Sequence, residues 1–334
     1  MAARGDDMMA IKDGDKHLPF GYLFDVNYFS QALKTSCPRI RIITSLEDID
    51  GRTTSNYTHL EPKTLAASLA RDYFPICINP SGWATNFHSF LAGFTPSVSA
   101  QNPRVIDLEV HYFEWPLSFD SPAFVATFGR IIQFTSDIKT VAAAVLYGIA
   151  TKYAPSITPS AGIQNGTFYG AHLRTAKDAT LSGWRTYDEQ SSDYLTEASS
   201  HNLSLIYLSS GNPNDTSRFI QTALTKNITV MTKEQILALP GFETEKQAMD
   251  AMSWDQKAML DYEIMLRASI FGGTFETSFG WNIALKRHIV VGGGTWVAGS
   301  DRPEAEGGVK FDDGRSKMFG RKGKMDFFPR TLWP

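Results

Sequence analysis

Residues 168–184 read Phe-Tyr-Gly-Ala-His-Leu-Arg-Thr-Ala-Lys-Asp-Ala-Thr-Leu-Ser-Gly-Trp, and this stretch decides the predicted fold. An apolar run from Phe168 to Leu173 ends abruptly at Arg174, and a polar turn follows. The pattern is typical of a buried parallel strand whose carboxyl end opens into a site, which is where α/β sheets bind ligands. Arg174 offers fixed donors for a phosphate or carboxylate. The alternative interpretation is a strand followed by a surface loop with an ordinary ion pair.

A second stretch, residues 261–287, reads DYEIMLRASIFGGTFETSFGWNIALKR. Its helical beginning leads to a short strand over residues 268–271, which the following glycine pair is expected to end. Thr277 and Ser278 then precede a helical run over residues 280–287. Glycines followed by hydroxyls at a helix start can bind an anion through backbone N–H groups and the helix dipole. Thr and Ser also cap helices without any ligand, so a plain N-cap is the alternative.

Four segments in order, over roughly residues 18–290, resemble motifs of the GDP-fucose protein O-fucosyltransferase-like family. They are PFGYLFDVNYF at 19–29, HLR at 172–174 with Asp178, IYLSSG at 206–211, and SIFGGTFETSF at 269–279. The resemblance implies an α/β, GT-B-like fold with two Rossmann-like domains facing a cleft. It also implies transfer of fucose from a GDP-fucose donor to a hydroxyl of a protein or glycan acceptor, without a metal or other cofactor.

The resemblance gives roles to the residues of the first motif. Arg174 would stabilise the negative charge that builds on the departing diphosphate, so it is the expected catalytic residue. His172 and Asp178 would belong with it to the donor-binding set. Considered alone, His172 is also consistent with a core histidine, and Asp178 with an acid that anchors the turn.

The second motif supplies the rest of the expected donor site. Thr277, Ser278 and the backbone after Gly273 would hold the diphosphate. Phe279 would stack on the base, and Asp261 would accept from guanine. The alternatives are a core position for Phe279 and a helix N-terminal acid for Asp261.

A Pro- and Ser-rich stretch at residues 153–160 is interpreted as a linker between two domains. Residues 1–152 would form an acceptor-side Rossmann-like domain, residues 161–300 the GDP-sugar-binding domain, and residues 301–334 a tail packing back on the body. The family's Gly/Asn-rich loop has no counterpart in residues 1–35, so the first domain is expected to be incomplete. Ala176 stands where plant members often carry a glutamate, which leaves the general base unassigned. The alternatives are a catalytically inactive GDP-sugar-binding member of the family and an unrelated α/β protein.

Composition excludes several classes of protein. The 334 residues carry a net charge of −3, with 43% hydrophobic and 20% charged residues, as in an ordinary globular protein without a basic nucleic-acid footprint. No apolar run approaches the ~18 residues of a membrane span.

Asp48 and Asp50 are interpreted as loop acids in preference to a metal site. Cys37 and Cys77 are expected to be free and buried.

Five Asn-x-Ser/Thr sequons are consistent with passage through the secretory pathway. They begin at Asn56, Asn165, Asn202, Asn214 and Asn227. Residues 1–17 contain no apolar signal segment. The expectation is therefore a Golgi or endoplasmic reticulum protein if the full-length gene carries a signal anchor, and a cytoplasmic protein if the chain is complete.

Element patterns differ between the two halves. The first half is predicted to hold helices at 20–33, 64–73 and 122–148, strands at 39–46 and 104–112, and a long loop over 79–103. The second half is predicted to hold strands at 168–173, 203–208, 228–231, 268–271 and 289–291. Helices alternate with these strands and are predicted at 188–200, 216–224, 254–267 and 281–286, with a further helix that begins at residue 233. This alternation favours a parallel sheet covered on both faces, with the loop after Leu208 at the same edge as Arg174.

Overall fold

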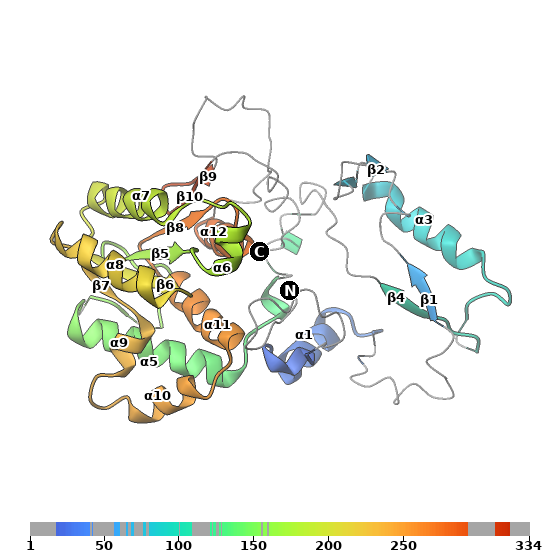
Figure 1. Cartoon of the computed structure of the whole chain (residues 1–334). Helices are drawn as coiled ribbons and strands as arrows, with labels where there is room; N and C mark the ends of the chain where they lie inside the picture. Colours follow the sequence, from blue (N-terminus) through green and yellow to red (C-terminus); the bar gives the residue numbers. More distant parts are fainter. Residues whose placement is uncertain are drawn as a thin grey trace.

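The structure is a computed structural model that describes most of the second half of the chain and parts of the first (Figure 1). The described residues are 18–40, 42, 57–60, 65, 68–69, 76–77, 80–99, 101–108, 121, 123–124, 127, 129–154, 156–158, 160–292 and 311–320. The expectations for residues 1–17, for Asp48 and Asp50, and for residues 321–334 lie outside this set. Among the described residues, no helix has both the length and the apolarity that crossing a bilayer requires.

A six-stranded sheet forms the centre of the second half (Figure 1). Its strands are β5 (Tyr169–Leu173), β6 (Leu205–Ser210), β7 (Thr229–Met231), β8 (Ile270–Thr274), β9 (Phe311–Asp312) and β10 (Ser316–Phe319). The spatial order is β7-β6-β5-β8-β10-β9. Neighbouring strands pair in parallel except β9 and β10, so the sheet is mixed. The predicted parallel α/β arrangement is confirmed for β5 to β8.

Helices cover both faces of this sheet, as the alternating pattern predicted (Figure 1). On one face lie α7 (Tyr187–Ser200) and α8 (Pro213–Leu224); on the other lie α5 (Ser136–Lys152), α9 (Lys233–Leu237), α10 (Glu243–Asp250), α11 (Trp254–Met265) and α12 (Ser278–Val290). Strand β6 shows the division: Tyr207 packs with the α11 side, whereas Ile206 and Leu208 pack with the α7 side. The architecture is compatible with a Rossmann-like fold.

Capping boxes set the start of three of these helices. Thr186 pairs with Glu189 at α7, Thr232 with Gln235 at α9, and Ser253 with Gln256 at α11. In each pair the hydroxyl accepts from the N3 backbone N–H, and the N3 side chain accepts from the N-cap backbone N–H. Two of the donors that a helix start leaves unpaired are therefore satisfied locally.

The described parts of the first half form small units. They contain the 3-10 turns η2 (Phe20–Tyr22) and η5 (Gly129–Ile131), the helices α1 (Val26–Ser36) and α3 (Pro80–Ala92), and four short strands. Strand β1 (Tyr57–Leu60) pairs in parallel with β4 (Val105–Leu108), and β2 (Ser68–Leu69) pairs antiparallel with β3 (Ile76–Cys77). The Cys37 thiol is free, as predicted, but it is half-buried.

The predicted loop over 79–103 is wrong, because α3 occupies its first half. Pro80 is the first residue of this helix, where its fixed φ suits the first turn and its missing N–H costs nothing. Phe87 stacks on Trp83, with ring centroids 5.4 Å apart, and also on Phe90, at 6.4 Å. These aromatic contacts at helical spacing prevail over the loop-like Gly, Ser and Asn residues around them.

The predicted helix over 122–148 is interrupted by η5 and an extended segment before α5. Phe134 forms an isolated antiparallel bridge with Phe24, and Thr135 donates its N–H to the Leu23 carbonyl at 3.0 Å. Pairing with the N-terminal segment therefore replaces helical bonds. Phe124 and Ile132 of this segment are exposed.

Other first-half predictions also need correction. The predicted helix 20–33 divides into η2 and α1, because the Asp25 carboxylate caps α1 by accepting from Tyr28 N–H at 2.9 Å. Strand β2 lies within the predicted helix 64–73. Arg39 forms part of a turn, and the remainder of the predicted strand 39–46 is either irregular or outside the described residues.

The Arg287 guanidinium ties together the end of α11 and the starts of β8 and β10. It is fully buried and donates to the carbonyls of Met265, Leu266, Ala268, Ser269 and Arg315 and to the hydroxyl of Ser316, over 2.7–3.3 Å. Burial lowers the pKa of Arg287 to about 9, so the group stays protonated at neutral pH. This anchoring keeps residues 289–290 in α12, and the strand predicted over 289–291 does not form.

Replacing Arg287 with lysine is expected to destabilise the protein by at least about 3 kcal/mol. A lysine keeps the charge but has only three donors on one nitrogen, so several buried carbonyls lose their partner. Urea unfolding followed by far-UV circular dichroism measures the change. Arg218→Ala, which removes an exposed ion pair with Asp188, serves as the control with an expected loss below about 1 kcal/mol. Equal losses in the two variants would contradict the anchoring role of Arg287.

Candidate functional site

The candidate site lies where the order of the strands reverses. The chain runs outward from β5 to β6 and β7 and then returns to form β8 on the other side of β5. Leu173 is in register with Ser210, and Ala171 with Gly272, so the three strands end at one edge of the sheet. This confirms the prediction that Arg174 and the loop after β6 share an edge. In open α/β sheets, a reversal point of this kind is where ligands bind.

Arg174 is held on this edge from three directions. Its guanidinium forms an ion pair with Asp178, and its Cζ lies 5.7 Å from the centroid of the Trp184 ring. The buried Gln190 side chain clamps its main chain, accepting from Arg174 N–H at 2.9 Å and donating to the Arg174 carbonyl at 3.0 Å. The Arg174 side chain keeps 13% of its surface exposed. The charge is therefore preorganised and still open to a ligand.

Sequence reasoning missed Gln190 and Trp184. Gln190 also donates to the Arg185 carbonyl at 2.7 Å, so one amide fixes both ends of the segment that follows β5. A buried glutamine on a helix has no short-range signature. The only useful signal was the capping box at Thr186, which sets the phase of α7 and so determines that Gln190 faces inward.

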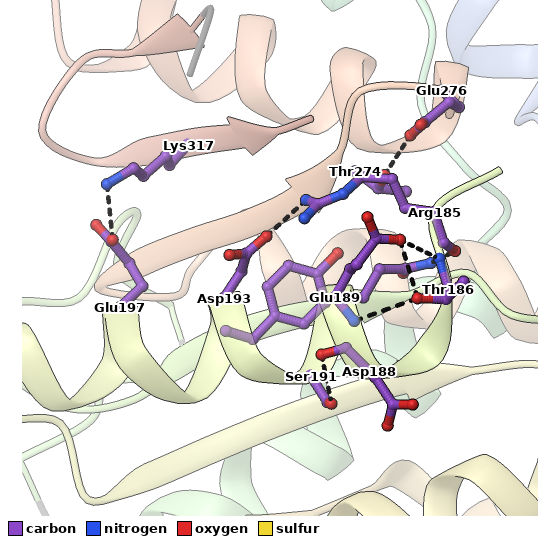
Figure 2. A network of polar contacts seen from close by, with 12 residues as sticks. Arg185, Thr186, Asp188, Glu189, Ser191, Asp193, Glu197, Thr274, Glu276 and Lys317 are labelled. Atoms are coloured by element: carbon purple, nitrogen blue, oxygen red, sulfur yellow. Dashed lines mark hydrogen bonds and ion pairs between the residues drawn. The ribbon is translucent and has the colours of Figure 1, made fainter. Parts of the chain in front are cut away.

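A polar network in Figure 2 fixes α7 against the sheet. The Arg185 guanidinium pairs with Asp193 at 2.6 Å, and Lys317 of β10 pairs with Glu197 at 2.7 Å. At the end of β8, the hydroxyl of the buried Thr274 donates to Glu276. The pair between Lys317 and Glu197 joins α7, the helix that carries Gln190, to strand β10.

His172 lies in the buried part of β5 next to the start of α12. Burial, together with the charge of Arg174, lowers the pKa of His172 to about 3, so the ring is neutral at pH 7. Its Nδ1 has no hydrogen-bond partner among the described residues. Its ring contacts Phe279 at a centroid distance of 4.7 Å, and Phe279 also contacts Tyr262 at 5.9 Å. Phe279 is thus half-buried between protein rings at the edge of the site.

The start of α12 presents backbone donors at the same edge. Thr277 is the N-cap, and its Oγ1 accepts from Gly280 N–H at 3.3 Å. The N–H groups of Ser278 and Phe279 make no hydrogen bond with the described residues. A helix start with free donors and a favourable dipole suits an anion. Within the described residues, no hydrogen bond or ion pair joins Arg174 to Thr277 or Ser278.

The glycine pair after Phe271 does not end the strand, contrary to the prediction. Gly272 and Gly273 both lie inside β8. A Cβ at Gly272 would lie 1.8 Å from the Tyr169 hydroxyl, and one at Gly273 would lie 3.1 Å from the Met318 sulfur. The two glycines therefore let side chains of neighbouring strands pack closely against β8. Gly273 therefore has a packing role inside β8, and its expected role in donor binding stays a prediction.

Asp261 lies inside α11 and does not open a helix. Its carboxylate accepts from Tyr207 at 2.6 Å and from Ser209 and Lys233, both at 2.8 Å. Burial raises the pKa of Asp261, and the Lys233 ammonium opposes this rise. The residue is 3% exposed, and its hydrogen bonds join α11 to β6 and α9. Lys233 and Tyr207 were not among the predicted site residues.

Comparison with known proteins adds no family assignment. No family model matches the chain, and no curated protein matches it. Among the described residues, no group of His, Cys, Asp and Glu side chains is arranged to hold a metal ion. The chemistry of the site therefore has to be argued from the residues at the edge formed by β5, β6 and β8.

The His172 ring is expected to remain neutral from pH 8 down to pH 5. Its folded pKa of about 3 lies below the unfolded value near 6.5, so the unfolded chain binds more protons between these values. The stability that the neutral buried ring contributes therefore falls as the pH drops below about 6.5. NMR of the ¹⁵N-labelled imidazole measures its charge, with a histidine peptide as reference. A titration midpoint near 6.5 for His172 would contradict the buried geometry.

Proposed function

We propose that this chain binds a nucleoside diphosphate sugar, most specifically GDP-fucose, and transfers the sugar to a hydroxyl of a protein or glycan. The observation that carries the proposal is the reversal of strand order between β5 and β8. Arg174 follows the first of these strands, and the N-terminus of α12 follows the second. A cation and free backbone donors at one sheet edge are the groups that a diphosphate requires.

The proposed donor site is electrostatically suited to a departing diphosphate. Arg174 gives a permanent charge, and its present partner Asp178 lies four residues away in a pair that a ligand oxygen can compete for. The Ser278 and Phe279 N–H groups add donors with the helix dipole behind them. Together they would stabilise the charge that grows on the diphosphate in the transition state, a role that a metal ion fills elsewhere.

The proposed reaction is a substitution at the anomeric carbon of the sugar. The acceptor oxygen forms a bond to this carbon while the bond from the carbon to the diphosphate oxygen breaks. The electron pair of the broken bond leaves with GDP, and the acceptor proton passes to a base. Because Arg174 is a donor only, it acts on the leaving group and does not take this proton.

The acceptor would approach from the N-terminal half in a GT-B arrangement, which is part of the proposal. Two contacts support it. Gln256, in the first turn of α11, donates to the Tyr22 carbonyl at 3.1 Å, and the hydroxyls of Tyr22 and Ser253 are hydrogen-bonded. The start of α11 lies at the carboxyl edge of the sheet, because α11 leads back to the beginning of β8. The N-terminal segment therefore reaches the edge that carries Arg174.

Guanine recognition by Asp261, as the family resemblance implies, requires a change in its contacts. Its carboxylate already has three internal donors and almost no exposed surface. A guanine base could bind it only if the side chain or its cover moved. Comparing GDP with UDP and ADP therefore tests the base specificity separately from the diphosphate site.

GDP is expected to bind the folded chain in the presence of EDTA, and Arg174→Ala is expected to weaken binding roughly 10- to 100-fold. This range corresponds to the ~1.5–3 kcal/mol of hydrogen bonds to a charged group. Arg174→Lys should recover only part of the loss, because one ammonium cannot replace a guanidinium fork. Isothermal titration calorimetry measures all three proteins.

Arg315→Ala is the matched control, because this arginine lies at the start of β10 on the opposite edge and its side chain bonds only the exposed Asn165 among the described residues. It should leave GDP affinity unchanged. Absence of GDP binding in folded wild-type protein would contradict the proposal. Binding without release of fucose from GDP-fucose to any hydroxyl acceptor would instead support the catalytically inactive alternative.

A further inference from the structure

Two of the sequons occupy one corner of the sheet, on the edge opposite the candidate site. Asn202 precedes β6 and Asn227 precedes β7, and these strands are parallel neighbours. Thr229 N–H donates to the Ser204 carbonyl at 2.8 Å, so the two sequons are directly adjacent. Both asparagines are exposed. A large modification here would leave the carboxyl edge accessible.

The backbone at both asparagines turns away from a helix in the same manner. Asn202 follows α7 with φ of 55°, and Asn227 follows α8 with φ of 58°. The next residues close the helices: Leu203 N–H donates to the Ala198 carbonyl at 2.9 Å, and Ile228 N–H to the Ala223 carbonyl at 3.1 Å. Asparagine is the second choice after glycine at such a position. Helix termination alone can therefore account for the asparagines.

Helix termination does not account for the hydroxyls two residues later. Ser204 and Thr229 are exposed, and neither hydroxyl forms a hydrogen bond with another described residue. The side-chain amides of Asn202 and Asn227 likewise have no partner in the described part of the chain. Each sequon thus has an accessible amide and a hydroxyl without any visible structural role.

The other described sequons differ in this respect. At Asn165, Thr167 is buried and its hydroxyl is 3.0 Å from that of Ser269. At Asn214, which lies in the first turn of α8 on the carboxyl edge, the Thr216 hydroxyl donates to the Asn212 carbonyl at 3.0 Å. In both sequons the hydroxyl already has a structural function.

We infer that Asn202 and Asn227 carry N-linked glycans. The donor would be a lipid diphosphate-linked oligosaccharide, and the host oligosaccharyltransferase would catalyse the transfer. A bond forms between the asparagine Nδ2 and the anomeric carbon while the bond from this carbon to the phosphate oxygen breaks. The lipid diphosphate leaves with the electron pair, and the amide loses one proton to the enzyme's base. This inference does not depend on the proposed transferase function, and it places this part of the chain in the lumen of the secretory pathway.

The native protein, purified from the cells that produce it, provides the test. Enzymatic release of N-glycans in H₂¹⁸O converts each glycosylated asparagine into an ¹⁸O-labelled aspartate, which peptide mass spectrometry locates. The expected result is label at residues 202 and 227 and none at 214. Unmodified asparagine at 202 and 227 in the native protein would overturn the inference.

Substitutions separate the sequons from the helix ends. Thr229→Ala and Ser204→Ala keep each asparagine, and so the helix end, but remove the sequon. Each variant, expressed from the full-length gene in a eukaryotic host, should lose one glycan as judged by electrophoretic mobility. Thr216→Ala is the matched control and should migrate as the wild type. Wild-type mobility of both Thr229→Ala and Ser204→Ala would also contradict the inference. After deglycosylation, each variant should unfold at the same temperature as the wild type, which excludes misfolding as the cause of a change in mobility.

Discussion

The structure depends on the parallel pairing of β5 with β6 on one side and with β8 on the other. Because the connections after β5 and after β8 run over opposite faces, the sheet edge opens between them at this one place. The same constraint places Arg174 and the start of α12 on one edge of the sheet, although they are about a hundred positions apart in the chain. A polar residue after either strand alone would be an ordinary surface group.

Arg287 is the interaction that keeps this arrangement rigid. Its guanidinium contacts backbone carbonyls at the end of α11, the start of β8 and the start of β10, and so holds β8 in place. At the end of β5, the Gln190 side chain fixes the residues that follow the strand in a similar manner. Both groups are buried, act on backbone atoms and lie outside the site itself. The site is thus positioned by two side chains that do not belong to it.

The sequence predicted much of the second half because its signals there are local. Apolar runs marked β5, β6 and β7, and the regular alternation of strand-like and helix-like segments marked the helices between them. Predictions failed where a distant partner decides the outcome. Gly272 resembles a strand breaker until the Tyr169 hydroxyl is seen to fill the space of its missing side chain. The short strands β9 and β10 carry no apolar run and exist because β8 offers them an edge.

The candidate site was also predictable from the sequence only in part. The spacing of Arg174 and Asp178 allowed their pairing to be expected, and Thr277 was recognisable as a helix cap. Asp261 could not be placed from sequence, because its partners Tyr207 and Lys233 come from other elements. Its burial turns an expected ligand contact into an internal ion pair. The groups that could handle charge at the sheet edge, Arg174 and the start of α12, stay a prediction.

A crystal structure of the chain with GDP would show where the diphosphate lies. We expect diphosphate oxygens within hydrogen-bond distance of the Arg174 guanidinium and of the Ser278 and Phe279 N–H groups, with the ion pair between Arg174 and Asp178 loosened. GDP bound away from the edge between β5 and β8, with Arg174 still paired only with Asp178, would contradict this expectation.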